Sequence, residues 1–363
     1  MVEPFFSFSF APQALKDSWQ AAISEVIASG IFINGPQKEA FEFEFADYLG
    51  TEFAIGVSNG LDGLILALES CGIGPGKKVA VPNHTFIATW LAVHHVGATP
   101  VGIAVDKQGL MDLTDLNLKI DEIDAVIPVH MHGGHVNMVL LLEMIKNKKL
   151  VTIEDASQCH GGVLNGKKIG TFGDVGVFSL YPTKNLGALG DAGVVVTNSI
   201  LIADQIREIS SYGSTIEDKY THNVLGRNAR MDEIQASILR VNLKHLDNWN
   251  NHRVQIANEY KSAFLKHGVP FMSSDGSVFH HFIIFSNDRD ALRDKLSKIG
   301  VTTEVYYPNP AYREYFDMVK CSSYNLEYNT EYLANNTIAL PISQWVSLSS
   351  AKIIADLIVG NYE

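Results

Sequence analysis

Length, composition and charge narrow the class of protein before any motif is considered. The chain has 363 residues, of which 46% are hydrophobic, enough for a large core and a smaller companion domain. The net charge of −12 argues against a nucleic acid or an anionic membrane as partner, because both need a sustained basic face. No apolar run reaches the roughly 18 residues of a membrane span, and the opening segment MVEPFFSFSFAPQ lacks the basic start and the cleavage site of a signal peptide. We therefore expect a cytoplasmic protein of two domains.

The order of elements along the chain predicts a sheet that is covered on both faces. Helical spacing appears over residues 14–29 and 36–50, and short β-rich runs then alternate with segments long enough for helices, such as 61–70 and 85–95. The β-rich runs are EFAIGVS, KKVAVP, TPVGIAV, DAVIPV, KLVTIED, DVGVFSL and GVVVTN. This alternation predicts an α/β fold with a mixed, mainly parallel sheet.

The C-terminal third of the sequence has a different pattern. Residues 231–268 are helical in their spacing, and a β-rich segment, SVFHHFIIF, and further helices follow. We place the domain boundary near Asp247, inside this long helical segment. The prediction is a large domain over residues 1–247 and a smaller α+β domain over residues 248–363.

Polar motifs stand where the β-rich runs end. SNG follows EFAIGV, NHTF follows VAVP, HMHGGH follows VIPV, EDASQCH follows LVTI, and YPTK follows GVFSL. In open parallel sheets, ligands bind at the carboxyl ends of the strands, where loops and helix N-termini meet. These motifs are therefore expected to form one site.

Asp155 and Lys184 are the candidate catalytic residues of that site. An aspartate at a strand end is also a common helix cap or sugar ligand, but a carboxylate facing a ring nitrogen would keep it protonated, as pyridoxal phosphate (PLP) requires. Most lysines are solvated surface charges, whereas Lys184 follows a strand and precedes the glycines of NLGALGDAG. A primary amine that loses its proton near neutral pH can bond covalently to such a cofactor.

An anion site is predicted from two other motifs. Asn59 and Gly60 stand where a strand turns into a helix, whose first N–H groups attract an anion, although a plain turn has the same letters. Ser179 can offer its hydroxyl to the same phosphate. Phe86 can stack on a flat ring or belong to the core.

Metal and disulfide chemistry are not favoured. Three histidines, His130, His132 and His135, have a spacing that can converge on one ion, but no nearby carboxylate or cysteine completes a ligand set. The three cysteines, Cys71, Cys159 and Cys321, are far apart and odd in number, which supports neither a disulfide framework nor a CxxC metal site.

Taken in order, the motifs resemble one enzyme family. NGLDGL, PNHTFIAT, IPVHMHG, EDASQCHGG, FSLYPTKNLGALGDAG and GRNARMDEIQA are similar to the motifs of the DegT/DnrJ-type nucleotide-sugar aminotransferases, a PLP-dependent branch of fold type I. The resemblance extends over residues 32–249 and implies the aspartate aminotransferase-like fold. It also implies transfer of an amino group from L-glutamate to a nucleotide-linked ketosugar.

The resemblance assigns roles around the cofactor ring. It implies that Lys184 forms the covalent bond with PLP and moves the proton during transfer, and that Asp155 pairs with the ring nitrogen. Gln158 would lie near the phenolic oxygen of the cofactor, and Phe86 would stack on the ring.

The resemblance also assigns the phosphate site. Ser179 and the turn at Asn59, Gly60 and Leu61 would hold the phosphate. The family residue that matches Asn228 reaches the phosphate from the neighbouring subunit, so the resemblance implies a homodimer with shared active sites. From the residues alone, Asn228 and Arg230 are suited to binding a phosphate or carboxylate, but a solvated helix start would look similar.

The sequence departs from the family pattern in ways that point to one branch. Tyr306 in EVYYP stands where the family usually has histidine, and NGL replaces the commoner S-G-T. Together with SSYGS and KYTH ahead of GRNAR, these motifs resemble those of the branch that aminates C-3 of dTDP-3-keto-6-deoxyhexoses. Three alternatives remain: amination at C-4 of a 4-ketosugar, a PLP-fold regulator without turnover, and a dinucleotide-dependent oxidoreductase, which lacks its G-x-G-x-x-G signature here.

Overall fold

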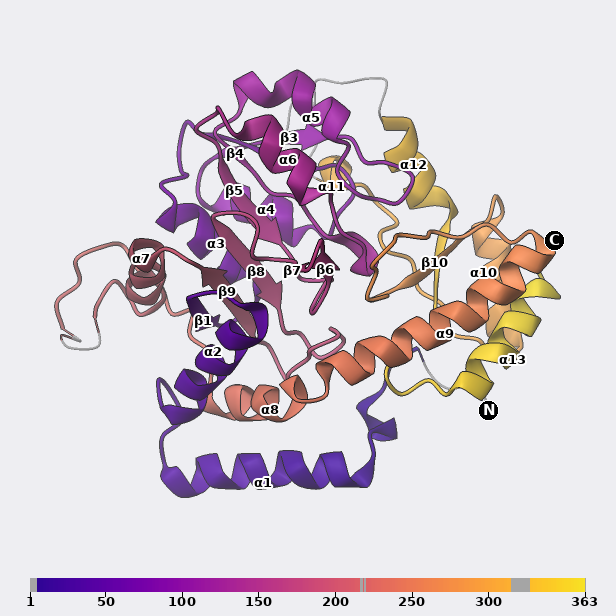
Figure 1. Ribbon diagram of the computed structural model, residues 1–363, viewed down its shortest axis with the longest axis horizontal. Helices are drawn as coiled ribbons and strands as arrows, with labels where there is room; N and C mark the ends of the chain where they lie inside the picture. The colour runs from indigo at the N-terminus through magenta and orange to yellow at the C-terminus, as the bar shows by residue number, and fades with distance from the viewer. Residues whose placement is uncertain (1–4, 216–217, 219, 315–326, 363) are drawn as a thin grey trace.

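A single mixed sheet forms the centre of the larger part of the molecule (Figure 1). The computed structural model describes residues 5–215, 218, 220–314 and 327–362. The sheet has seven strands in the order β1-β9-β8-β5-β4-β2-β3, all parallel except β9, which is antiparallel to both β8 and β1. Their bounds are β1 Phe53–Val57, β2 Lys78–Pro82, β3 Thr99–Ile103, β4 Ala125–Val126, β5 Val151–Asp155, β8 Val175–Ser179 and β9 Gly193–Thr197. The predicted fold class is confirmed.

The topology brings the carboxyl ends of six strands to one edge. Because β1 and β8 are both antiparallel to β9, they run in the same direction as each other and as the remaining strands. Gly193, at the start of β9, is in register with both Val57 and Ser179. The segments that follow β1, β2, β4, β5 and β8 therefore all begin at the same edge.

Alternating side chains along the strands build two apolar layers. Ile55 and Val57 face the layer covered by α3 (Gly60–Ser70), α4 (Ala88–His95) and α7 (Ile200–Ser210). Ala54 and Phe178 face the opposite layer with α2 (Pro36–Leu49) and α8 (Glu233–Leu243). On that side, α5 (Leu113–Lys119) and α6 (Met138–Ile145) cover β2–β4. Burial on both faces explains why these strands are almost continuously apolar.

Helix α1 (Gln13–Ser29) lies outside these layers, along the lower side of the view in Figure 1. It packs against α8 through Leu15 and Trp19, which share an apolar cluster with Ile238. The Trp19 Nε1–H donates to Asn242 Oδ1 at 2.8 Å.

The C-terminal part has its own apolar core. The elements of this part of the chain are α9 (Leu246–His267), β10 (Phe282–Phe285), α10 (Arg289–Lys298), α11 (Ala311–Glu314), α12 (Glu327–Asn336), β11 (Thr337–Leu340) and α13 (Leu348–Val359). The antiparallel pair β10–β11 packs with α9, α10 and α13, which lie side by side with it at the right of Figure 1. The long helical pattern over 231–268 is two helices, since α8 ends at Leu243 and α9 begins at Leu246. The boundary at residue 247 stays a prediction, because α9 runs through it.

The remaining described elements are short: the 3-10 helices η1 Phe8–Phe10, η2 Ile120–Glu122 and η3 Met131–Gly133, and the hairpin strands β6 Val163–Leu164 and β7 Lys167–Lys168. Cys159 is buried and Cys71 is half-buried, both as free thiols, while Cys321 lies outside the described residues. Within the described ranges, no helix combines the length and apolar character that crossing a membrane requires.

Candidate active site

Lys184 lies in the loop that joins β8 to β9, at the shared carboxyl edge of the sheet. Its backbone N–H donates to Tyr181 O at 2.9 Å, which closes a turn around Pro182. The loop then folds back so tightly that a Cβ at Gly187 would be 2.4 Å from Pro182 O. The glycines that follow the lysine therefore allow the loop to wrap around it.

The amine of Lys184 is held in a state that suits covalent chemistry. The surrounding protein lowers the pKa of Lys184 to about 8, mainly because burial disfavours the ammonium ion, and the charge of Asp155 opposes this shift. A substantial fraction of the amine is thus unprotonated near pH 8, which a nucleophilic lysine requires.

Asp155, the last residue of β5, is buried with both carboxylate oxygens held. Thr89 Oγ1 donates to Oδ2 at 2.9 Å, and the backbone N–H of Ser157 donates to Oδ1 at 3.2 Å. Neither donor is charged, so the carboxylate is oriented while its negative charge is left for another partner.

Gln158 is fixed from both ends of its amide. The backbone N–H of His132 donates to its Oε1 at 2.8 Å, and its Nε2 donates to the Tyr307 hydroxyl at 3.1 Å. Burial raises the pKa of Tyr307, so this hydroxyl keeps its proton. Tyr307 also contacts Phe86, with ring centroids 5.5 Å apart. Phe86 is 53% exposed, which leaves ring surface available for a ligand.

Two glycines let the N-terminus of α3 approach the end of β8. A Cβ at Gly60 would be 2.8 Å from Ser179 Cβ, and one at Gly193 would be 2.5 Å from Asn59 O. Asn59 caps α3, its Oδ1 accepting from Asp62 N at 2.9 Å, and its side chain is thereby occupied within the turn. The main-chain N–H groups that open α3, at Gly60 and Leu61, have no partner inside the helix. Anion binding here would therefore use the backbone and Ser179.

Asn228 is the one predicted site residue that the structure places apart from this group. Its side chain is exposed, and its Oδ1 accepts from Arg230 Nε at 3.1 Å. The backbone oxygen of the next residue, Ala229, accepts from Ser58 N at 3.1 Å, so the backbone passes beside the turn that opens α3. The Asn228 side chain itself faces outward.

His130 and His132 of the HMHGGH motif have partners other than a metal. His130 Nε2 lies 3.1 Å from Glu154 Oε2, and His132 Nδ1 lies 3.1 Å from His281 Nδ1. His135 is only half-buried. Among the residues that the structure describes, no group of three or more potential metal ligands is placed to bind an ion.

The sequence did not single out several residues that complete the site. Thr89 and Tyr307 stand inside quoted motifs, PNHTFIAT and EVYYP, but their contacts with Asp155 and Gln158 cross 66 and 149 residues of chain. His160 Nε2 lies 2.8 Å from Ser179 O. Tyr306, which the sequence did single out at the family's histidine position, stacks on His281, with ring centroids 4.0 Å apart.

The chemistry of these groups fits a flat, anionic cofactor that carries an aldehyde. A helix N-terminus and Ser179 suit its phosphate. A buried carboxylate, Asp155, suits a protonated ring nitrogen, and the amine of Lys184 suits the aldehyde carbon. The donor set therefore matches PLP.

Comparison with known proteins gives a consistent result. The profile of the DegT/DnrJ/EryC1/StrS aminotransferase family matches residues 13–359. The chain is 41% identical over 315 residues to the dTDP-3-amino-3,4,6-trideoxy-alpha-D-glucose transaminase of Streptomyces venezuelae, covering 85% of this chain and 83% of that one. It is 38% identical over 370 residues to the erythromycin biosynthesis sensory transduction protein EryC1 of Saccharopolyspora erythraea, covering 98% and 99%.

A solved structure shares almost the whole fold. S. venezuelae DesV, crystallised in complex with a ketimine intermediate, superposes with a TM-score of 0.94 at 37% identity, over 99% of this chain and 98% of that chain.

Proposed function

Because this chain belongs to the DegT/DnrJ/EryC1/StrS aminotransferase family, we propose that it transfers an amino group from L-glutamate to C-3 of a dTDP-linked 3-keto-6-deoxyhexose. The chain is a PLP-dependent aminotransferase, as its family is. The observation that carries the proposal is that the Lys184 amine, whose pKa burial lowers to about 8, is close enough to the oriented carboxylate of Asp155 to feel its charge. When bound, PLP carries the amino group from donor to acceptor and withdraws electrons from the carbon that loses its proton.

Each site residue has a task in this proposal. Lys184 Nζ would hold the cofactor between reactions, then take a proton from the donor α-carbon and deliver it to the cofactor carbon that carried the aldehyde, and the reverse transfer would serve the sugar. Asp155 keeps the ring nitrogen protonated, and its hydrogen bonds from Thr89 and Ser157 prevent the carboxylate from turning away. Gln158 is directed at the phenolic oxygen, and Ser179 and the first turn of α3 hold the phosphate.

Two kinds of evidence support amination at C-3. The S. venezuelae relative is named for a 3-amino product. The motifs NGLDGL, SSYGS and GRNAR and the tyrosine at position 306 resemble the same branch; Lys219 of KYTH lies outside the described residues. The position matters because C-3 and C-4 carbonyls differ by about one bond length in place, and a misplacement of ~1 Å can cost ~100-fold in rate.

Product analysis tests the substrate. The purified enzyme is incubated with glutamate and either the 3-keto or the 4-keto isomer of a dTDP-6-deoxyhexose, and the position of nitrogen is found by NMR. We expect faster amination at C-3, with 2-oxoglutarate formed in equal amount and no product from Lys184→Ala. Faster amination of the 4-keto isomer would contradict the C-3 assignment and leave the aminotransferase assignment intact.

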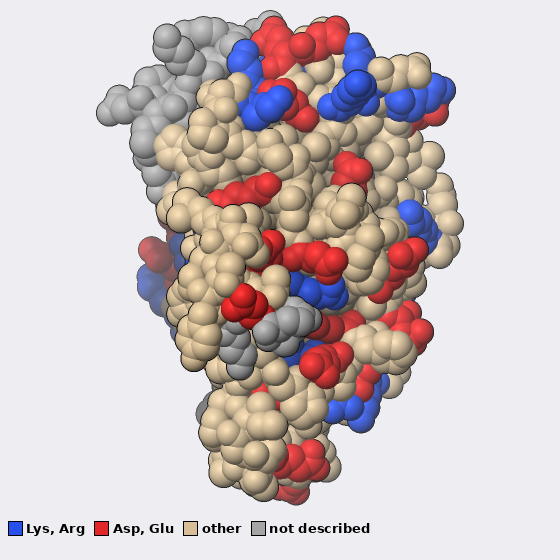
Figure 2. All heavy atoms as spheres, turned by 90° about the vertical axis from the view of Figure 1, so that its left-hand side faces the viewer, with Lys and Arg blue, Asp and Glu red and all other residues tan. Residues whose placement is uncertain are grey.

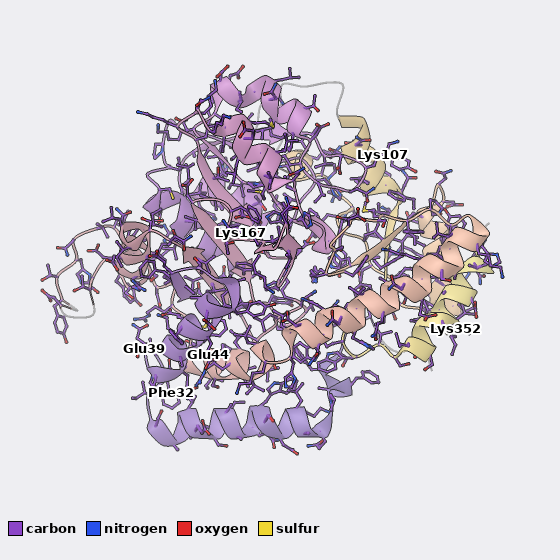
Figure 3. The ribbon with its side chains drawn as sticks, in the orientation of Figure 1. Phe32, Glu39, Glu44, Lys107, Lys167 and Lys352 are labelled. Atoms are coloured by element: carbon purple, nitrogen blue, oxygen red, sulfur yellow. The ribbon has the colours of Figure 1, made fainter. Side chains whose placement is uncertain are left out.

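A homodimer with shared sites is the second part of the proposal. The segment between α7 and α8 projects as an arm at the left of Figure 1, and its residues Tyr220 and Leu225 are 93% and 96% exposed. Phe32, which is 47% exposed, lies on the same side (Figure 3). Figure 2 shows uncharged residues on that side, with acidic and basic side chains scattered among them. Exposed apolar surface of this kind is typical of an interface, and a second copy would place its Asn228 near this chain's phosphate turn.

The EryC1 relative is named a sensory transduction protein, which raises as a second candidate function for this chain a PLP-fold regulator without turnover. The lowered pKa of Lys184 suits covalent attachment of PLP in both candidate functions, so turnover has to be tested directly. Loss of the cofactor's visible absorbance on addition of glutamate would exclude this candidate.

A further inference from the structure

The histidine pair His280 and His281 precedes β10 in the C-terminal part of the chain, and none of the roles above involves it. We infer that the two side chains position the two cofactor-directed groups: His280 acts on Lys184 through Asn185, and His281 acts on Gln158 through His132. The inference rests on the proposed roles of Lys184 and Gln158.

The link from His280 ends next to Lys184. Asn185 is fully buried, and its Nδ2 donates to Asn250 Oδ1 at 2.8 Å and to Val278 O at 3.0 Å. A backbone carbonyl only accepts, so this contact fixes the orientation of the amide and leaves Asn185 Oδ1 as an acceptor. His280 Nδ1 lies 3.0 Å from that oxygen and must therefore carry its proton. Asn185 is held on every side, which fixes the backbone that carries Lys184.

The link from His281 ends at Gln158. His281 Nδ1 lies 3.1 Å from His132 Nδ1, and the backbone N–H of His281 donates to His132 O at 3.2 Å. The N–H of His132 in turn donates to Gln158 Oε1 at 2.8 Å. His132 has a φ of 58°, a left-handed conformation that a side chain other than glycine adopts only when its surroundings hold it. The contacts with His281 provide that restraint.

Close packing makes both links possible. Gly133 has a φ of 93°, and a Cβ there would be 2.6 Å from the backbone nitrogen of His280. Val278 N donates to Gly133 O at 3.0 Å, which joins the same two segments again. Residues 278–281 therefore touch the turn that holds Gln158 and the residue after Lys184 at the same time.

The surroundings of these histidine rings keep them neutral, so the rings act through hydrogen bonds and not through a positive charge. Burial lowers the pKa of His280 and of His281, and the nearby amine of Lys184 lowers both further. Burial also lowers the pKa of His132 to about 3. All three rings are neutral at physiological pH, and each can donate from one nitrogen and accept at the other.

Substitutions at His280 and His281 separate positioning from packing. His281→Phe preserves a ring against Tyr306 but removes Nδ1, whereas His281→Asn retains a polar atom near the place of Nδ1; His280→Phe and His280→Asn form the second pair. His252→Phe is the matched control, because it removes a ring-nitrogen contact of 2.7 Å with Val346 O that lies outside both links. Each holoenzyme is measured for kcat, KM, thermal unfolding, and the pH midpoint and maximum of its visible absorbance.

We expect each phenylalanine variant to lose roughly 10- to 100-fold in kcat with KM within about twofold of wild type, because misplacement of reacting groups costs rate more than binding. The absorbance midpoint shifts in the same variants, and the asparagine variants recover most of both losses. His252→Phe alters neither. Wild-type kcat and absorbance in the phenylalanine variants would overturn the inference. The inference would also be overturned if the asparagine variants were as impaired as the phenylalanine variants and if each variant lost kcat only in proportion to its loss of folded protein. The absorbance is measured without any sugar, so it tests the inference independently of the substrate. If the substrate assignment is wrong, the wild-type enzyme will bind PLP but make no aminosugar.

Discussion

The pKa of Lys184 is lowered because the loop around the amine excludes water, and this effect is larger than the opposing effect of the Asp155 charge. Burial disfavours the ammonium ion, while the nearby carboxylate favours it, and burial is the larger effect. The lowered pKa means that the protonated lysine is less stable in the folded site than in the unfolded chain, which destabilises the folded protein. This cost is fully present below about pH 8 and disappears as pH rises past the pKa of an unfolded lysine.

The balance of these two effects predicts how the amine reacts. In the cofactor-free protein, labelling of Lys184 by an amine reagent should rise with a midpoint near pH 8, and bound PLP should prevent it. Asp155→Asn removes the opposing charge, so the midpoint should move to lower pH. Mass spectrometry of the Lys184 peptide measures the labelled fraction. A midpoint that stays in place or rises in Asp155→Asn would show that the carboxylate does not act on the amine.

At the scale of elements, the strand ends determine where the chemistry lies. Asp155 closes β5, Ser179 closes β8 and Asn59 follows β1, so the sequence order of motifs and strands was enough to predict that they share an edge. The hydrophobic pattern of the sequence predicted the fold class, because strands buried on both faces are apolar throughout. The break between α8 and α9 was not predicted, because both helices have the same amphipathic spacing.

Contacts between residues that are far apart along the chain could not be predicted from the sequence. The partners of Gln158 include Tyr307, and those of Asn185 include His280; both pairs form only when the C-terminal part packs against the sheet edge. A motif shows which residue types are present but not which distant segment meets them. The domain boundary and the site roles therefore remain predictions, whereas the fold class and the family are confirmed.

The approach of α3 to β8 gives a prediction about cofactor binding. In Gly60→Ala the new methyl group would lie 2.8 Å from Ser179 Cβ and 3.2 Å from its Cα, so α3 or the end of β8 must move. We expect the dissociation constant for PLP to rise about tenfold or more, because the helix N-terminus and Ser179 no longer face one phosphate together.

Gly74→Ala is the matched control for this variant. A Cβ at Gly74 would meet only Val96 O, at 3.6 Å, which is ordinary contact. Titration of the cofactor-free proteins with PLP measures both constants. Equal affinity in Gly60→Ala and wild type would show that the phosphate binds elsewhere.

At the scale of the whole molecule, the proposed homodimer would bring the outward side chain of Asn228 to the active site of the second copy. An inactive Lys184→Ala chain mixed with an Asn228→Asp chain should regain activity, because a mixed dimer contains one site with both native residues. Random exchange of subunits in equal amounts should give about a quarter of the wild-type number of intact sites. Activity assays before and after exchange, with light scattering to establish the dimer, measure the gain. No recovery after confirmed exchange would place Asn228 in its own chain's site or outside any site.

The visible spectrum of the PLP-loaded enzyme tests most directly whether the group around Lys184 performs amino transfer. We predict an absorbance band that depends on the covalent bond between Lys184 and PLP, that disappears on addition of L-glutamate, and that returns when a dTDP-linked ketosugar is added. Lys184→Ala should lack the band while remaining folded. A band that glutamate leaves unchanged, or one that persists in Lys184→Ala, would contradict the account.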